Sequence, residues 1–269
     1  GYLALCTSNL PDPEIALPGD NFNTVLYTGD GNTTQAITGV GFQPDMVWVK
    51  DRGRTQDNVL VDAIRLAGNY LVTNSTDAEA TDTVFTAFDS DGFTVGDQAQ
   101  SNTGSENYIG WNWLAADTFD PADDGTIVTA SGRSNATAGF SIVKYTGTGS
   151  TVTIGHGLSS KPDLIIVKGL GATGWPTYQS PQGATYVIFL ESTSGSSNSG
   201  ASGYWGDTEP DASVFTVQDS SQTNNTSVEY ISYVFHSVEG YSKIGVYTGN
   251  GNDDGTFIYT GFRPAYFLF

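Results

Sequence analysis

The chain has 269 residues, and its 29 acidic and 10 basic side chains give a net charge of −19. This balance argues against nucleic acid and against an anionic membrane surface as partners, because both are bound through clustered Lys and Arg. A single cysteine excludes an internal disulfide framework, and no apolar run reaches the length of a membrane span. The length itself favours two domains.

Residues 1–20 are expected to form an extended linker, because Pro11, Pro13 and Pro18 cannot donate to a β-ladder. The chain begins with Gly1 rather than Met and ends inside the apolar run 265–269. We therefore expect it to be a segment of a longer protein.

Three stretches repeat one motif at one spacing. Tyr27, Tyr145 and Tyr247 each begin the sequence Tyr-Thr-Gly-x-Gly. A proline follows 17 residues later in every copy, at Pro44, Pro162 and Pro264. The copies start 118 and 102 residues apart, from 27 to 145 and from 145 to 247. This length suits one β-sandwich per copy, whereas a solenoid repeat would be about 20–50 residues long.

The local patterns within each copy are those of strands. The runs 143–145, 164–167 and 186–190 are β-branched or aromatic and are bounded by turn residues. The runs 46–49 and 164–167 are apolar at every position, which predicts strands that are covered on both faces. Only residues 60–67 could form more than a turn of helix.

These patterns predict an all-β fold of tandem, jelly-roll-like β-sandwiches, two complete and a third begun. The expected divisions are sandwiches at 21–116 and 139–240, a linker at 117–138 with a possible edge strand at 126–129, and the start of a truncated third copy at 241–269.

The acidic residues do not form a catalytic pattern. The pairs Asp89/Asp91, Asp123/Asp124 and Asp253/Asp254 lie in glycine-containing turns. A glycosidase instead needs two carboxyl groups on opposite sides of a bound sugar, one of them with a raised pKa. We therefore expect no enzymatic activity.

No cofactor or metal site is expected either. Residues 250–255 resemble the first half of a calcium loop, but Gly261 stands where the bidentate Glu is needed. His156 and His236 have neither metalloprotease spacing nor a Gly-x-Ser-x-Gly elbow beside them.

The ligand-binding candidates are aromatic. Trp175 and Tyr178 lie in the segment 169–183, which is rich in Gly, Pro and Ser and longer than a hairpin needs. Exposed rings there could stack on a host-surface glycan. The alternative is that both rings pack beneath the loop against the sheet.

The repeated motifs resemble those of a family of bacteriophage virion proteins, mostly from marine and cyanobacterial phages. Residues 22–269 carry the likeness through Tyr-Thr-Gly-x-Gly, Phe-x-Pro-Asp-x-Val-x-Val-Lys, the motif 205–210 and the run 240–245. The second copy departs from the pattern, with Lys161 at the Phe position. Residues 1–11 are similar to the exit of a lectin-like SPRY-type domain.

The resemblance implies a non-enzymatic structural protein of the virion, located in a tail fibre or another external appendage. Its expected partners are other virion proteins, further copies of itself in a homo-oligomer such as a trimer, and a host-surface glycan. Two alternatives stay open: a capsid decoration or head-fibre protein, and a tailspike-like enzyme that degrades polysaccharide.

Overall fold

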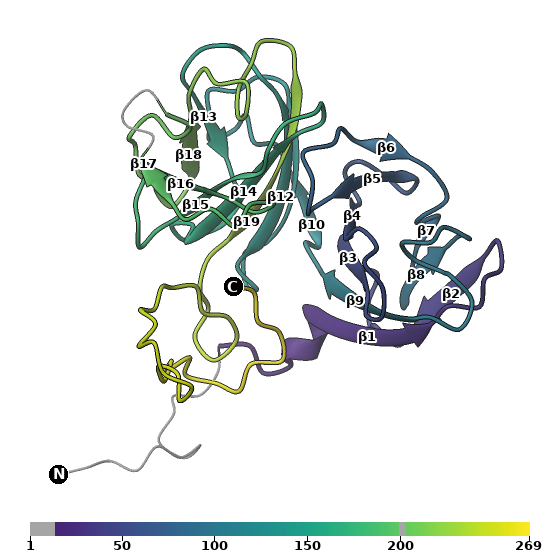
Figure 1. The fold of residues 1–269 in the computed structure, drawn as a ribbon. Coiled ribbons are helices and arrows are strands. Elements are labelled where there is room, and N and C mark those ends of the chain that lie inside the picture. Colours follow the sequence, from purple (N-terminus) through teal and green to yellow (C-terminus); the bar gives the residue numbers. More distant parts are fainter. Residues whose placement is uncertain (1–13, 199–202) are drawn as a thin grey trace.

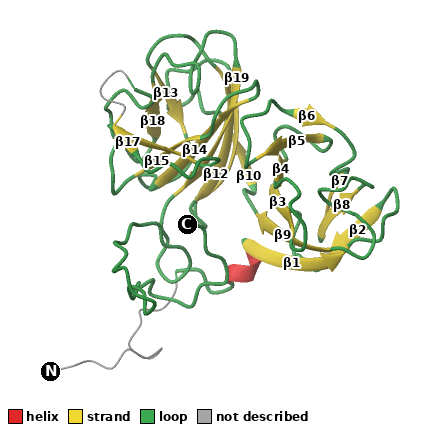
Figure 2. Cartoon of the chain, viewed as in Figure 1, coloured by secondary structure: helices red, strands yellow, loops and turns green. Residues whose placement is uncertain are grey.

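The computed structural model describes residues 14–198 and 203–269 and confirms the all-β fold. Two β-lobes lie side by side, and the C-terminal residues form a separate coil (Figure 1). The one helix in the described residues is a 3-10 turn at Pro18–Asp20, which Figure 2 marks just before the first strand. Most of the linker expected at 1–20 lies outside the described residues.

The first lobe is a sandwich of two antiparallel sheets. Its larger sheet has the order β1 (Phe22–Thr28), β9 (Asn107–Trp113), β3 (Met46–Asp51), β4 (Val59–Asp62), β5 (Asn69–Val72) and β6 (Ala80–Thr81). Its smaller sheet has the order β2 (Gln35–Thr38), β8 (Gly92–Val95) and β7 (Ala87–Asp89).

The second lobe repeats this arrangement. Its larger sheet has the order β10 (Asp117–Phe119), β11 (Ala130–Asn135), β12 (Phe140–Thr146), β19 (Glu229–Phe235), β14 (Leu164–Gly169), β15 (Pro176–Gln179), β16 (Tyr186–Phe189) and β17 (Ser197–Asn198). Its smaller sheet pairs β13 (Val152–Gly155) with β18 (Val214–Val217). In both lobes the last long strand, β9 or β19, lies between the strand that ends in the Tyr-Thr-Gly-x-Gly turn and the strand that follows the proline.

The segment expected to be a linker, 117–138, instead supplies β10 and β11 to the second sheet. The run Ala130–Asn135 has a polar sequence with little strand preference. It forms a strand because it pairs with β12 on one side and β10 on the other, while the Phe119 ring lies directly over Gly132. The edge strand suggested at 126–129 does not form, and Ile127 is instead buried in the core of the second sandwich.

Residues 60–67 also do not form the helical segment that the sequence allowed. Val59–Asp62 is strand β4, and a tight turn follows it because the Asp62 carboxylate accepts the N–H groups of Ile64 and Arg65 at 3.1 and 2.9 Å. An aspartate at this position stabilises a turn rather than a helix interior.

The strands after the proline are buried on both faces, as their continuous apolar runs predict. Val47 and Val49 of β3 enter the core of the first sandwich, whereas Met46 and Trp48 enter a cluster shared by the two lobes. In β14, Ile165 and Val167 face inward in the same way. The shared cluster makes the larger sheets of the two sandwiches pack against each other.

Each sandwich closes with a pair of stacked tyrosines. Tyr27 of β1 and Tyr108 of β9 lie opposite each other with ring centroids 5.2 Å apart, and Tyr145 and Tyr230 repeat the pair at 5.3 Å. Tyr108 and Tyr230 also order the loops that precede their strands. The Tyr108 hydroxyl donates to Ala99 O, and the Tyr230 hydroxyl donates to Ser221 O.

The third copy has the repeat's sequence, but residues 241–269 contain no strand. The β1-type and β3-type strands of a sandwich are not neighbours, because a β9-type strand lies between them. Residues 241–269 include the counterparts of the first two segments but not that of the β9-type strand. Within the described residues, its two strand-like runs therefore have no strand beside them with which to pair.

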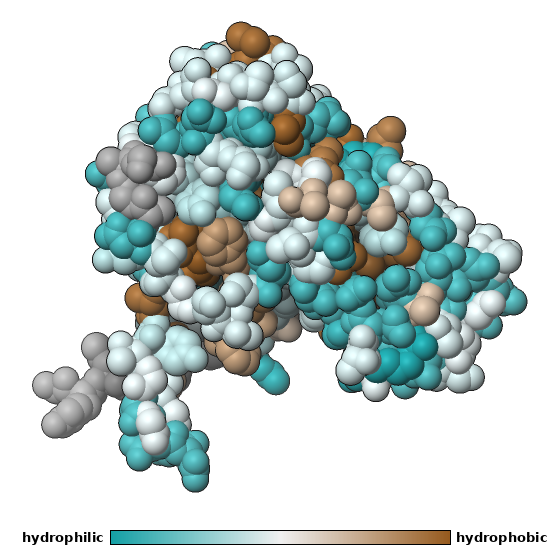
Figure 3. Space-filling view, turned by 45° about the horizontal axis from the view of Figure 1, so that its top comes forward, coloured by the Kyte–Doolittle hydropathy of each residue, from teal (hydrophilic) through white to brown (hydrophobic). Residues whose placement is uncertain are grey.

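Polar residues cover much of the surface visible in Figure 3. Figure 3 shows a face on which hydrophilic residues predominate and apolar residues form separate patches. Within the described residues, no helix has the length and apolar character needed to cross a membrane.

Candidate functional site: the interface between the two sandwiches

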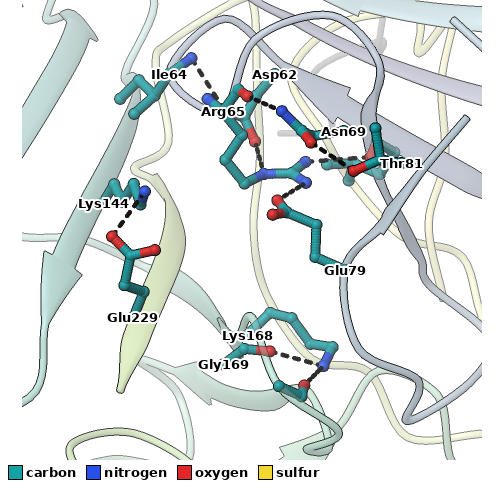
Figure 4. Close-up of polar contacts among 12 residues, drawn as sticks. Asp62, Ile64, Arg65, Asn69, Glu79, Thr81, Lys144, Lys168, Gly169 and Glu229 are labelled. Carbon is teal, nitrogen blue, oxygen red and sulfur yellow. Dashed lines mark hydrogen bonds and ion pairs between the residues drawn. The ribbon is translucent and has the colours of Figure 1, made fainter. Parts of the chain in front are cut away.

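The most elaborate polar arrangement in the described residues lies where the two sandwiches meet. It is built around Asp62 and Arg65, at the end of β4, and Tyr233, in β19 of the other sandwich (Figure 4 shows the first two). Around it, the shared apolar cluster includes Trp48, Leu71, Phe140, Ile166, Trp175 and Ile231. The polar groups are thus enclosed by hydrophobic side chains from both domains.

Asp62 and Arg65 form a buried ion pair. The Arg65 Nε atom lies 2.6 Å from Asp62 Oδ2, and both side chains have almost no exposed surface. Burial alone would lower the pKa of Arg65, but the adjacent Asp62 carboxylate outweighs it, so the pKa lies above its usual range. The guanidinium therefore stays charged, and its charge is balanced within the interface.

Tyr233 connects this pair to the second sandwich. Its hydroxyl donates to Asp62 Oδ2 at 2.7 Å and accepts from Arg65 Nη2 at 3.3 Å. Burial raises the pKa of Tyr233 well above 10; the Arg65 charge opposes this shift and the Asp62 carboxylate adds to it, so the proton that bridges the two domains is retained. A half-buried Glu79 accepts from Arg65 Nη1 at 3.0 Å and completes the network.

The Asp62 carboxylate has no free acceptor position. It accepts four hydrogen bonds, from the Ile64 and Arg65 backbone, from Arg65 Nε and from the Tyr233 hydroxyl. An ionised carboxylate offers about four lone-pair sites, and all are used here. The group is thus arranged to hold the domains together and not to take a proton from a substrate.

A second buried cation lies at the same interface. Lys168 Nζ donates to Gly169 O, Gly171 O and Thr173 Oγ1 at 2.8–3.2 Å, and it lies 5.8 Å from the centroid of the Trp175 ring. Burial, opposed by the charges of Glu191 and Asp77, lowers the pKa of Lys168 to about 8. The lysine fixes the loop after β14, whose Leu170 carbonyl accepts the N–H of Glu79 from the first sandwich at 2.9 Å.

Both aromatic ligand candidates lie in the core. Trp175 and Tyr178 have 0% exposed surface, because the expected loop 169–183 contains strand β15. The Trp175 indole N–H donates to Ser75 O across the interface at 3.0 Å, and the Tyr178 hydroxyl donates to Glu209 Oε2 at 2.6 Å. Neither ring offers a face to a sugar, so their position is that of packed side chains beneath the surface.

The two histidines are structural by their contacts. His156 is buried, its Nδ1 accepts the N–H of Leu158 at 3.1 Å, and its Nε2 lies 3.2 Å from Asp211 O. Burial lowers the pKa of His156, which favours the neutral ring that this pair of contacts requires. His236 Nδ1 lies 2.9 Å from Ser237 O.

The carboxylates of the pair Asp89 and Asp91 make structural contacts. Asp89 ends strand β7 and accepts the Thr94 hydroxyl at 2.6 Å. Asp91 accepts the N–H groups of Gly39 and Gly41 at 3.1 and 2.7 Å. In residues 14–198 and 203–269, no three His, Cys, Asp or Glu side chains come close enough together to hold a metal ion.

Asp62, Arg65 and Tyr233 were not among the residues that the sequence patterns indicated. The available signal was the spacing Asp-x-x-Arg directly after a fully apolar strand, which places a charged pair next to a core. The third member, Tyr233, lies 171 residues from Asp62 and could not be assigned without the packing of the domains.

A family model described as a domain of unknown function (DUF7483) matches residues 17–269. The match spans both sandwiches and the third copy, but its description names neither a phage nor a virion. No curated protein and no solved structure matched the chain.

Proposed function

We propose that this chain, which belongs to the DUF7483 family, is a non-enzymatic structural module of a phage virion, located in a tail fibre or another external appendage. The motif likeness described above supports the phage origin. The way in which the two sandwiches are joined supports the structural role, because it makes them one stiff unit.

The observation that carries the proposal is the buried interface. The larger sheets of both sandwiches share one apolar cluster, and the ion pair of Asp62 and Arg65 is fastened to Tyr233 inside it. Two domains connected only by a flexible linker would move independently. A packed interface with a saturated polar network instead makes them a stiff rod segment, as an appendage that transmits position or force requires.

A second, partly exposed contact holds the junction at its edge. Arg133 of β11 forms an ion pair with Asp45 of the first sandwich, with Nε 2.7 Å from Oδ1, and Asp45 Oδ2 also accepts the N–H groups of Ala115 and Ala116. Asp45 therefore fixes both residues 115–116 and Arg133 of the connecting region to the first sandwich.

The experiment is to label purified virions of a phage that encodes this chain with antibodies raised against residues 21–240. Labelling of tail or fibre supports the proposal, and labelling of the capsid surface favours the decoration-protein alternative. Virions that carry no copy of the chain would overturn it.

A separate assay tests the non-enzymatic part. Incubation of the chain with host capsule or lipopolysaccharide should release no reducing ends. Release that persists after gel filtration of the protein would favour the tailspike-like alternative.

A further inference from the structure

The aspartate that follows the repeat's proline lies where the chain leaves the first sandwich. The Asp45 N–H donates to the carbonyl of Trp113, the last residue of β9, at 2.8 Å. The Asp45 side chain is buried, and its Oδ2 atom accepts the N–H groups of Ala115 and Ala116 at 2.8 and 2.9 Å. One residue thus holds both the last strand of the sandwich and the first residues beyond it.

The second copy uses its own aspartate in the same way. The Asp163 N–H donates to the carbonyl of Phe235, the last residue of β19, at 2.8 Å, and Asp163 Oδ2 accepts the N–H of Ser237 at 2.8 Å. Ala115 and Ser237 both stand two residues after the last strand of their sandwich. The contact is therefore a property of the repeat, and the sequence Pro-Asp marks it.

Ala116 is held in a conformation that alanine rarely adopts. Its φ angle is +44°, towards the left-handed region. Asp45 accepts its N–H, and its carbonyl accepts Arg133 Nη2 at 2.9 Å. The Arg133 Nε atom in turn lies 2.7 Å from Asp45 Oδ1. Because Ala116 is exposed, these two charged side chains impose its conformation through the backbone.

This conformation directs the chain into the second sandwich. Strand β10 begins directly after Ala116 and pairs with β11, which carries Arg133. Figure 1 shows β9 and β10 on either side of the boundary between the two lobes. The contacts therefore form a closed path, which runs from Asp45 through Ala116 and β10 to β11 and returns through Arg133.

The angle between the sandwiches depends on such a directional contact. The apolar cluster between the larger sheets stabilises their packing, but hydrophobic burial has no direction of its own. Packed sheets occur both aligned and at near right angles. The path that leaves β9 restricts this choice, because β10 is the edge strand of the second sheet and starts directly after Ala116.

We propose that Asp45 sets the angle between the two sandwiches by holding Ala116, together with Arg133, in its left-handed conformation. Asp45 is then the positioning residue of the first junction, and Asp163 has the same task where the chain leaves the second copy. The repeat therefore encodes the direction of the chain after each sandwich as well as the sandwich itself.

The test measures the distance between spin labels on the two sandwiches of the full chain. Cys6→Ser removes the native thiol, and Ser90→Cys and Ser159→Cys introduce exposed attachment sites, one on each sandwich. Double electron–electron resonance then reports the distribution of angles as a distribution of distances. We expect one narrow distribution for this labelled chain. The measurement uses the isolated chain, so its result does not depend on a virion location.

Asp45→Asn removes the charge but keeps the shape of the side chain. An asparagine has one acceptor oxygen, so its NH2 group faces either Arg133 or the N–H groups of residues 115–116, all of which are donors. We expect the population of other angles to rise about tenfold or more, as the loss of a hydrogen bond to a charged group would cause.

Ala116→Val tests the backbone conformation without changing the carboxylate. A β-branched residue is disfavoured at positive φ, and the side chain at position 116 is exposed. This surface substitution should therefore redistribute the distances as Asp45→Asn does, and it provides the test even if Asp45→Asn fails to fold. Ala116→Gly, which suits positive φ, should keep the narrow distribution.

Two matched controls separate this role from general destabilisation. Ala36→Val makes the same substitution at an exposed position of strand β2, where valine suits the backbone. Asp163→Asn removes the equivalent carboxylate, which acts on the exit from β19. Both variants should keep the narrow distribution. An unchanged distribution in Asp45→Asn or in Ala116→Val would overturn the proposal, and so would an equal redistribution in either control.

Discussion

The turn of the third copy folds like the turns of the other two, but its strands do not. Gly31, Gly149 and Gly251 have φ values of +70°, +68° and +70°. In each copy the residue after this glycine donates its N–H to the side chain two positions earlier, at 2.8 Å in the first copy, 3.3 Å in the second and 3.0 Å in the third. Only the first two turns are preceded by a strand.

The difference separates what a short sequence can specify from what it cannot. A side-chain-capped turn with one left-handed glycine satisfies its hydrogen bonds within five residues. A strand leaves its N–H and C=O groups to be satisfied by neighbours, so it forms only where those neighbours exist. The same Tyr-Thr-Gly sequence is therefore part of a strand and a turn in two copies and part of a coil and a turn in the third.

The largest expected effect comes from the tyrosine of the middle strand. Tyr230→Ala should lower the free energy of unfolding by about 3–5 kcal/mol, because it opens a cavity beside Tyr145 and removes the hydroxyl that orders the preceding loop. Chemical denaturation monitored by tryptophan fluorescence measures this change in the free energy of unfolding.

Tyr247→Ala is the matched control and should change the free energy of unfolding by less than about 0.5 kcal/mol. A loss comparable to that of Tyr230→Ala would mean that the third copy is packed in solution, and the comparison between the copies would then fail.

Replacing the first glycine of the Tyr-Thr-Gly-x-Gly motif should have the next largest effect on stability. A Cβ at Gly147 would lie 2.2 Å from Asn225 O, and at Gly29 2.3 Å from Thr103 O, whereas nothing lies within 4 Å at Gly249. Gly147→Ala should therefore destabilise the protein by roughly 1–3 kcal/mol, since backbone must move to admit the methyl group. Gly249→Ala should be neutral in the same thermal melts, and equal effects at the two positions would contradict the open environment of the third copy.

Much of this fold was predictable from the sequence, and the limits have physical reasons. The tandem β-sandwiches and the doubly covered strands follow from the repeat and from the apolar runs at 46–49 and 164–167. The strand at 130–135 was missed because Gly132 and its polar neighbours become a strand only through β10 and β12. For Trp175 and Tyr178 the sequence left both surface stacking and packing beneath the loop open, because composition cannot show that β15, which begins directly after Trp175 and contains Tyr178, runs beside the core.

The candidate site was less predictable. In the sequence, a charged pair directly after a strand is equally typical of a solvated turn. Arg65 acquires its role only because the second sandwich buries it and places the Tyr233 hydroxyl 3.3 Å from its Nη2 atom. Such a contact depends on how whole sheets pack, which no local pattern specifies.

A smaller effect distinguishes the equivalent lysines of the two complete copies. Lys50 donates to Gln56 O alone, whereas Lys168 is fully buried with three acceptors. The pKa of Lys168 is lowered to about 8 in the folded protein, below the value of about 10.4 in an unfolded chain. The unfolded state therefore binds more protons between these values, and stability rises with pH across that window.

From pH 8 to pH 9.5, we expect Lys168 to add roughly 1–2 kcal/mol to the free energy of unfolding. The window stops there because the raised pKa values of Tyr145 and Tyr233 lower stability once unfolded tyrosines ionise near pH 10. In urea titrations over this pH range, the free energy of unfolding of the Lys168→Met variant should not rise with pH. That of the Lys50→Met variant should rise as it does in the unmodified chain. A rise that survives in Lys168→Met would assign it to another group.

The smallest effect isolates one hydrogen bond of the tyrosine pair. The Tyr145 hydroxyl donates to Thr223 O at 2.6 Å inside the second sandwich, and Tyr27 donates to Ser101 O at 2.8 Å in the first. Tyr145→Phe keeps the stacked ring but leaves the Thr223 carbonyl without this donor, so it should cost about 0.5–1.5 kcal/mol. Tyr247→Phe should cost nothing measurable in the isolated chain, because Tyr247 is exposed and lacks a stacking partner. A measurable loss of stability in Tyr247→Phe would instead show that this hydroxyl is engaged in the third copy, and the contrast with Tyr145 would then fail.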